Sequence, residues 1–298
     1  MTVDTSQHGH PDDAVVLRAA CARAGLDRRD ARLIRVHANA IYHLPHADAV
    51  ARIRDADAAE SLRAAVRVTR WLSTAGFPAV QPLDADQPVV IGDRAVTFWR
   101  YLPRQDDCQP GSGDLARRLR QLHRMPPPPF PVPATRPLGS TRRQAAISPV
   151  LTSRQRAWLL RRCDELAAAY HEIDWILPRG IVHGDAHTGN LLPHPVHQWV
   201  LIDWDSVSPG PPEYDFMPVY NRLRRFGYPP GTWQEFTRAY GTGLTGWPGM
   251  DTLSEIREIR SLAAFIRNAP RHPAAHRELA NRLDSLISGD RTRRWHAL

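Results

Sequence analysis

Carboxylate, amide and imidazole side chains gather in one short polar stretch of the 298-residue sequence, between two apolar segments. The stretch contains Asp185 and Asn190, and Asp203 and Asp205 follow the next apolar segment. Carboxylate and amide oxygens are the ligands that Mg²⁺ takes in preference to those of softer metals. We therefore expect Asn190 and Asp203 to hold a magnesium ion, with Asp205 either assisting that ion or bonding only to backbone. This leaves Asp185 to accept the proton of an attacking hydroxyl, which is the chemistry of phosphoryl transfer.

Alternating apolar segments and turn residues predict a small sheet in the first hundred residues. The expected strands cover 32–36, 41–44, 49–53, 89–91 and 95–102. Helical spacing predicts a helix before Gly25 and another over 58–74. After Pro103 the composition favours helices, with short strands at 180–182 and 199–202 on either side of the polar stretch. The pattern is typical of an α+β protein.

The string His183-Gly184-Asp185-x-His187-x-Gly189-Asn190, followed by Ile202-Asp203-Trp204, resembles the aminoglycoside phosphotransferase and choline kinase-like family, distant relatives of protein kinases. Asp185 and Asn190 have the spacing of the kinase catalytic loop H-R-D-x-x-x-x-N. The resemblance covers most of the chain. It implies a two-lobed protein-kinase-like fold, with a small N-terminal antiparallel-sheet lobe (1–102) that binds nucleotide and a larger, mostly helical C-terminal lobe (103–298) that carries the catalytic loop and the acceptor.

The same resemblance implies an ATP- and Mg²⁺-dependent enzyme that moves the γ-phosphate to a hydroxyl of a small molecule, such as an antibiotic, a sugar or an amino alcohol. Asp185 is then the catalytic base, and His183 is the second catalytic residue, which helps to organise the loop. Asn190 and Asp203 become metal ligands, and His187 helps to organise the loop on the substrate side.

Upstream residues fit the nucleotide side of such an enzyme. The stretch 36–42, which includes Asn39, takes the place of the loop that covers the phosphates, although it has no glycine. Arg52 stands where kinases carry the lysine of V-A-I-K, and a guanidinium can fork onto phosphate oxygens. The helix over 58–74 has no glutamate at the usual partner position, and Glu60 in its first turn is the candidate substitute.

Two further segments take roles from the resemblance. The resemblance makes residues 98–102 the hinge that hydrogen-bonds adenine through its backbone, with the side chains of Trp99 and Tyr101 contacting the nucleotide or serving as ordinary core. In the segment 210–216, Asp215 matches a position that buttresses the catalytic loop, and Glu213 is expected to face the acceptor.

The composition excludes several other chemistries. All 39 residues counted as Lys+Arg are arginine, so there is no lysine for a Walker A loop, a Schiff base or a lysine nucleophile. The net charge is +8, yet the arginines are spread among acidic residues, and we expect no nucleic-acid partner. No apolar run reaches the roughly 18 residues that cross a bilayer. Three scattered cysteines complete the prediction of a cytoplasmic protein without a disulfide framework.

Two other functions stay open at this point. His183, Asp185 and His187 on alternate residues could form the metal cluster of a hydrolase. A kinase-like protein that binds nucleotide without catalysis is also compatible with Arg52.

For the acceptor, residues 206–298 hold 13 arginines against nine carboxylates, which favours a neutral or weakly charged compound over a polycation. An acidic patch would reverse that preference if four side chains converged, namely Glu213, Asp251, Glu255 and Glu258.

Overall fold

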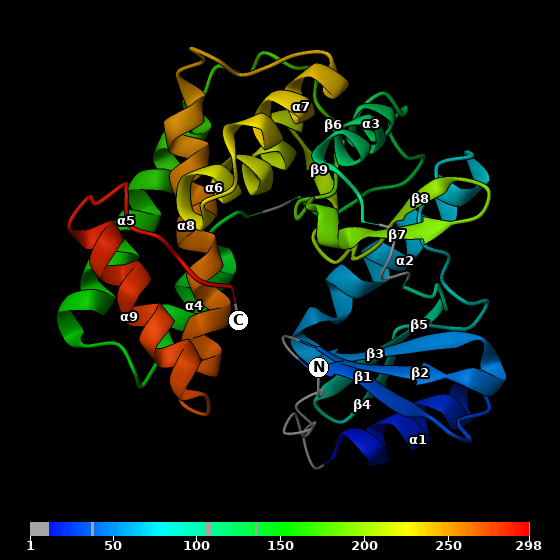
Figure 1. Cartoon of the computed structure of the whole chain (residues 1–298). Coiled ribbons are helices and arrows are strands. Elements are labelled where there is room, and N and C mark those ends of the chain that lie inside the picture. Colours follow the sequence, from blue (N-terminus) through cyan, green and yellow to red (C-terminus); the bar gives the residue numbers. More distant parts are fainter. Residues whose placement is uncertain (1–11, 37–38, 105–108, 135, 298) are drawn as a thin grey trace. The chain divides into compact units, whose positions relative to one another are not determined.

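The computed structural model describes residues 12–36, 39–104, 109–134 and 136–297 (Figure 1). Contacts divide the chain into two compact units. Unit 1 comprises residues 1–110, 127–133 and 189–207, and unit 2 comprises 111–126, 134–188 and 208–298. The stretch with Asn190 and Asp203 thus belongs to the sheet-rich unit, and Asp185 belongs to the helical one. The lobe boundary at residue 102 stays a prediction from the sequence.

Unit 1 is built on a five-stranded antiparallel sheet, which Figure 1 shows. Its strands, in spatial order, are β1 (Arg32–Val36), β2 (Ala40–Leu44), β3 (Ala49–Asp55), β5 (Arg94–Arg100) and β4 (Val89–Ile91). The five strands expected from the sequence are all present, and Gly92 takes a left-handed backbone in the turn between β4 and β5.

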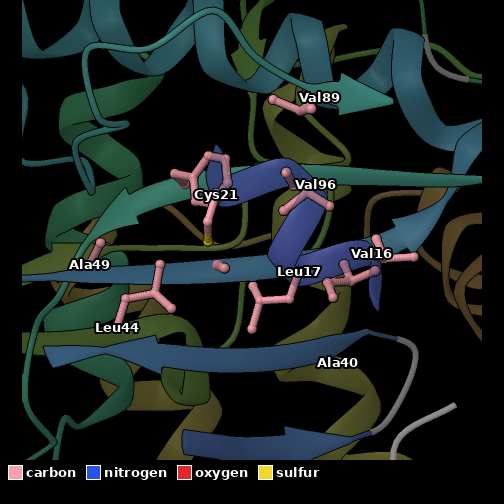
Figure 2. Packing of buried hydrophobic residues seen from close by; sticks show 12 residues of the cluster. Val16, Leu17, Cys21, Ala40, Leu44, Ala49, Val89 and Val96 are labelled. Atoms are coloured by element: carbon pink, nitrogen blue, oxygen red, sulfur yellow. The ribbon is translucent and has the colours of Figure 1, made fainter. Parts of the chain in front are cut away.

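The two-residue period of β3 separates a core face from a polar face. Ala49, Ala51 and Ile53 are buried on one face, where helix α1 (Asp13–Ala24) covers the sheet. Figure 2 shows Val16, Leu17 and Cys21 of that helix packed near Ala40, Leu44 and Ala49. The alternate residues Val50, Arg52 and Arg54 belong to the opposite face. The pattern of small and apolar residues on one face therefore aims Arg52 away from the core.

A second helix and a hairpin complete unit 1. Helix α2 (Ala59–Thr74) buries one stripe, which consists of Leu62, Ala65, Val66, Val68, Thr69 and Leu72. Strands β7 (Leu191–His194) and β8 (Gln198–Leu201) form an antiparallel hairpin, and Leu201 exchanges backbone hydrogen bonds with residues 78 and 80. The register pairs Leu191 with Leu201, so Asn190 and Ile202 lie at the same end of this hairpin.

Unit 2 is mostly helical. Its helices are α3 (Ser112–Leu122), α4 (Gly139–Ile147), α5 (Ser153–His171), α6 (Met217–Phe226), α7 (Pro230–Tyr240), α8 (Gly249–Asn268) and α9 (Pro273–Ile287). Helix α8 contacts α4, α5, α6 and α9, and so forms the centre of this unit. No described helix is both long and apolar enough to cross a membrane.

The two strands beside the polar stretch belong to different sheets. Strand β6 (Gly180–Val182) pairs with β9 (Ser208–Gly210) in unit 2, whereas β8 pairs with β7 in unit 1. Strand β7 contains Pro193, a residue that weakens any strand signal in a sequence because it cannot donate to a ladder. The polar stretch therefore runs from one unit into the other.

Candidate active site

A cavity of about 410 Å³ in unit 1 contains most of the residues expected to bind nucleotide and metal. Arg52, Trp99 and Tyr101 line it together with Asn190 and Asp203. Its apolar wall comes from β1, β2, β3, the segment between α2 and β4, and the 191–202 hairpin, and includes Ile34, Ile41, Val50, Val80, Leu192 and Ile202. An apolar slot with a few convergent polar groups is the usual form of a small-molecule site.

Two arginines of β3 bind the two aspartates that follow β8. Arg52 donates from Nη2 to Oδ1 of Asp203 at 2.8 Å, and from both terminal nitrogens to Asp205 at 3.0 and 3.3 Å. Arg54 donates to Oδ2 of Asp205 at 2.6 Å. Burial by itself would lower the pKa of Arg52, but the two carboxylates outweigh it and raise that pKa, so the guanidinium stays charged.

Asp203 and Asn190 form a donor set that fits a magnesium ion. Both line the same cavity, and the backbone N–H of Ile202 donates to the carbonyl of Asn190 at 2.9 Å, which ties the two segments together. Asp203 has a left-handed backbone with φ of 66°, and its side chain is 37% exposed. One accessible carboxylate and one amide suit an ion that takes its remaining ligands from water and phosphate.

Asp205 is bound by both arginines of β3. Its side chain is only 7% exposed, and both carboxylate oxygens accept hydrogen bonds from arginine. Glu60 is exposed, so the carboxylates that pair with Arg52 are Asp203 and Asp205 and not the helix residue suggested by the sequence. This geometry lets Asp205 position Arg52 and Arg54, and its assignment as a metal ligand stays a prediction.

Two backbone N–H groups of the expected hinge are already hydrogen-bonded within unit 1, whereas its aromatic side chains line the cavity. The N–H groups of Arg100 and Tyr101 already donate to the carbonyls of Gln81 and Asp48. The Tyr101 ring stacks on His43 with centroids 3.9 Å apart, and both residues line the cavity. Trp99 and Tyr101 can therefore contact a nucleotide base through their rings.

The proposed phosphate-covering loop is only partly described. Asn39 precedes β2, and its Oδ1 is buried without a hydrogen-bond partner among the described residues. His37 and Ala38 lie outside the described residues. The assignment of Asn39 to the nucleotide stays a prediction.

In unit 2, a buried carboxylate holds the loop that carries Asp185. Asp215 accepts the backbone N–H groups of His183 and Gly184, each at 2.7 Å, and also contacts Nε2 of His123 at 3.1 Å. Gly184 has φ of 79°, a left-handed conformation that favours glycine. His183 is fully buried, and its Nδ1 accepts the N–H of Asp185 at 3.3 Å. His183 thus shapes the loop, and Asp215 has the buttressing role that the sequence predicted.

Arginines of helix α8 surround the carboxylate of Asp185. Nη2 of Arg257 lies 2.7 Å from Oδ1 of Asp185, with the two side chains 21% and 34% exposed. Arg260 donates to the carbonyl of Gly184 at 2.5 Å and to the Tyr214 hydroxyl at 3.0 Å. Burial would raise the pKa of Asp185, but Arg257 and Arg260 outweigh it and hold that pKa well below its usual range. Asp185 is therefore ionised throughout the physiological pH range.

The two residues expected to face the acceptor lie in different surroundings. His187 is partly buried, and its Nδ1 has no hydrogen-bond partner among the described residues. Burial, with help from Arg222 and Arg257, lowers its pKa to about 4, so the ring is neutral at pH 7. Glu213 is fully buried and accepts the N–H groups of Ile176 and Leu177 at 2.9 and 2.8 Å. This side chain anchors the 176–177 backbone and does not face an acceptor.

The geometry gives no support to a hydrolase metal cluster at His183, Asp185 and His187. Within the described part of the chain, no group of three or more histidine, cysteine or acidic side chains is arranged to hold a metal ion. The burial of His183 under the loop explains this, because its ring is turned to Asp185 N–H.

Several charged residues near the site were not singled out from the sequence. Arg54 could have been found, because the two-residue period of β3 puts it on the face of Arg52. Arg257 and Arg260 are three residues apart, which places them on one face of a helix, but the sequence does not show which face meets Asp185. Arg35 and Arg104 line the cavity of unit 1 and also carry no signal in the sequence.

The profile of the phosphotransferase enzyme family matches residues 30–253, and the chain belongs to this family. The matched region includes both aspartate motifs and β3. No curated protein sequence matches the chain significantly.

Solved structures with similar folds are kinases and phosphotransferases of small molecules. The amicoumacin kinase hAmiN, solved with AMP-PNP, Ca²⁺ and Ami, has a TM-score of 0.69 and 14% identity, with 96% of each chain covered. The microcompartment-associated aminopropanol kinase has a TM-score of 0.68 and 19% identity, covering 94% of this chain and 99% of that one. Aminoglycoside phosphotransferase APH(3'')-Id from Streptomyces rimosus, solved with ADP and streptomycin, has a TM-score of 0.60 and 20% identity, covering 84% of this chain and 99% of that one. The fold is kinase-like, as predicted, and together with the family it supports a small-molecule phosphotransferase.

Proposed function

We propose that the protein transfers the γ-phosphoryl group of ATP to a hydroxyl of a small molecule, with Mg²⁺ as cofactor. One observation carries this proposal: Arg52, Asn190 and Asp203, from distant parts of the sequence, line a single cavity of unit 1. The aromatic residues Trp99 and Tyr101 line that cavity as well. A triphosphate nucleotide needs this combination of an apolar slot, cations and a metal-binding carboxylate.

Arginine takes the part that lysine plays in most kinases. Arg52 is held by Asp203 and Asp205, and a guanidinium so fixed can still donate to a phosphate oxygen with a remaining N–H. Arg35 and Arg104 add positive charge to the same cavity. A polyanion is therefore attracted to the cavity by charge as well as by hydrogen bonding.

Asn190 and Asp203 are the residues that would hold Mg²⁺. When bound, the ion neutralises charge on the phosphates and stabilises the leaving group. Asp203 presents an accessible carboxylate for this task, and Arg52 orients it through Oδ1.

Asp185 orients the acceptor. The hydroxyl donates a hydrogen bond to its carboxylate, the hydroxyl oxygen bonds to the γ-phosphorus, and the bond from that phosphorus to the bridging oxygen of ADP breaks. The hydroxyl proton passes to Asp185. Because the pKa of Asp185 is low, the carboxylate is a weak base, and orientation in a loose transition state contributes more than early proton removal.

An ATP-consumption screen at fixed Mg²⁺ tests this function. The acceptors are aminoglycosides, nucleoside antibiotics, macrolides, amino alcohols and simple sugars, and phosphorylated product is confirmed by mass spectrometry. We expect Mg²⁺-dependent transfer by the wild type and none above background by Asp203→Ala. Asp84→Ala, which removes an exposed carboxylate of the same unit, is the matched control and keeps the wild-type rate. Equal rates for Asp203→Ala and the wild type would contradict the proposal.

A further inference from the structure

Three arginines meet at the loop that carries Asp185. Arg257 and Arg260 come from α8, and Arg222 comes from α6, which packs against α8 (Figure 1). Arg222 donates from Nη1 to the Thr188 hydroxyl at 2.8 Å, three residues after Asp185. Burial lowers the pKa of His187, and the positive charges of Arg222 and Arg257 lower it further.

The three guanidiniums do not have equal freedom. Arg260 is tied to the Gly184 carbonyl and the Tyr214 hydroxyl, and so belongs to the scaffold of the loop. Arg257 has its 2.7 Å contact with Asp185 and remains 21% exposed. A guanidinium has five N–H donors, so this contact leaves donors of Arg257 for a second partner.

The neighbouring carboxylates do not balance this positive charge. Asp215 lies beneath the loop with both oxygens on His183, Gly184 and His123. Of the acidic residues considered for an acceptor patch, Asp251, Glu255 and Glu258 line a different cavity of unit 2, where arginines pair with them. Glu213 is buried on the 176–177 backbone. Glu258 pairs with Arg225, and Glu255 pairs with Arg162. Asp185 is thus a partly exposed carboxylate beside three cations.

In the proposed reaction, the arginines around Asp185 determine which charge the acceptor can carry next to its hydroxyl. Asp185 must receive the acceptor hydroxyl, so Arg257 has to share or release its contact with that carboxylate. A cationic group placed here would face Arg222 and Arg257 and would be repelled. An anionic group would give Arg257 a partner at the moment when the hydroxyl approaches Asp185.

We propose that the acceptor carries an oxyanion, a carboxylate or a phosphate, near the hydroxyl that is phosphorylated, and that Arg257 binds it with help from Arg222. This inference rests on the proposed function and narrows its substrate class. It replaces the neutral compound suggested by the net charge of residues 206–298 with an anion recognised by specific side chains.

A charge-matched set of hydroxyl compounds tests the proposal. The set comprises glucose, glucuronate, glucose 6-phosphate and glucosamine, together with glycerol, glycerate, glycerol phosphate and 3-aminopropane-1,2-diol. Wild type, Arg257→Met, Arg257→Lys and the surface control Arg238→Met are assayed for ATP-dependent phosphorylation. We expect at least about tenfold higher kcat/KM for anionic members than for their neutral or cationic counterparts. The carboxylate and phosphate members distinguish the two sources of the oxyanion.

The variants separate acceptor binding from catalysis. Arg257→Met should raise the KM for anionic acceptors at least about tenfold, the usual size of a lost charge-assisted contact, while the KM for ATP changes little. Arg257→Lys should recover part of this loss, and Arg238→Met should match the wild type. Faster transfer to neutral or cationic members, with Arg257→Met unaffected, would overturn the proposal but leave the proposed function intact.

A direct binding measurement keeps the proposal testable if no member of the set is phosphorylated. The Nε–Hε signal of Arg257 is assigned by its loss in Arg257→Met and is followed by NMR during titration with acetate, inorganic phosphate or ethylammonium. We expect saturable shifts with acetate or phosphate and none with ethylammonium. Absence of any shift with both anions would overturn the proposal. Shifts without phosphoryl transfer to any acceptor in either screen would instead count against the proposed function.

Discussion

In each unit an aspartate that the proposed reaction uses forms an ion pair with an arginine, and the two ion pairs differ in burial and geometry. In unit 1, Arg52 is 9% exposed at its side chain and forks onto both Asp203 and Asp205. In unit 2, Arg257 contacts Asp185 through Nη2, and both side chains are partly exposed. A buried, forked contact fixes geometry, whereas a single exposed contact can be exchanged for a ligand. The first suits the positioning of phosphates and metal, and the second suits an acceptor that enters and leaves.

Arg52→Met should produce the largest effect on stability. It removes one of the two arginines that bind the buried Asp205, and breaking a buried pair by removing one partner costs about 3–5 kcal/mol. We expect the lower end of that range, because Arg54 remains. Urea unfolding followed by tryptophan fluorescence measures the change.

Arg257→Met provides the comparison for that measurement. Its contact with Asp185 is partly exposed, so the free energy of unfolding should fall by about 1 kcal/mol or less. Arg52→Lys keeps a charge and should recover part of the loss in unit 1. Equal losses for Arg52→Met and Arg257→Met would show that the two contacts do not differ in the way described.

Asp205→Asn tests whether Asp205 positions Arg52 while Asp203 binds the metal. If Asp205 positions Arg52, its loss should raise the KM for ATP by about tenfold through a weakened charge-assisted contact and leave the Mg²⁺ concentration dependence unchanged. Asp203→Asn should shift the Mg²⁺ dependence itself. Kinetics across a Mg²⁺ titration measure both. A shift of the same size in the two variants would make Asp205 a metal ligand, as the sequence first suggested.

The contribution of His187 to stability should depend on pH. Burial lowers its pKa from 6.5 to about 4, so between these values the unfolded chain binds a proton that the folded chain does not. The free energy of unfolding therefore falls as the pH drops through this window, by at most about 1.4 kcal/mol per pH unit. His187→Gln should flatten this slope in urea unfolding at pH 4.5–7. The exposed control His171→Gln should keep it, and an unchanged slope in His187→Gln would contradict the burial of its ring.

The sequence predicted the elements of this protein better than the partners of its charged residues. The five strands of the unit 1 sheet and the helices α1 and α2 follow from the local spacing of apolar residues within each segment. The partner of Arg52 depends on contacts with residues about 150 positions away, and no local pattern encodes it. Glu60 was therefore the wrong candidate.

Burial explains the other differences at the site. Glu213 has the charge expected of a residue that binds a substrate, but the structure buries it under the 176–177 backbone. The motif around Asp185 indicated the chemistry because its spacing is local. Arg257 could not be found in the same way, because its role depends on which face of α8 meets the loop.

Asp185→Asn tests the central claim most directly, because the claim assigns nucleotide binding to unit 1 and acceptor orientation to unit 2. Nucleotide affinity is measured by titration calorimetry with AMP-PNP and Mg²⁺, and turnover is measured with the best acceptor from the screen. The predicted result is an affinity within about threefold of the wild type and a turnover reduced by about 10²-fold or more, the usual size of a general-base effect. Wild-type turnover, or a loss of nucleotide affinity as large as the loss of turnover, would contradict the account.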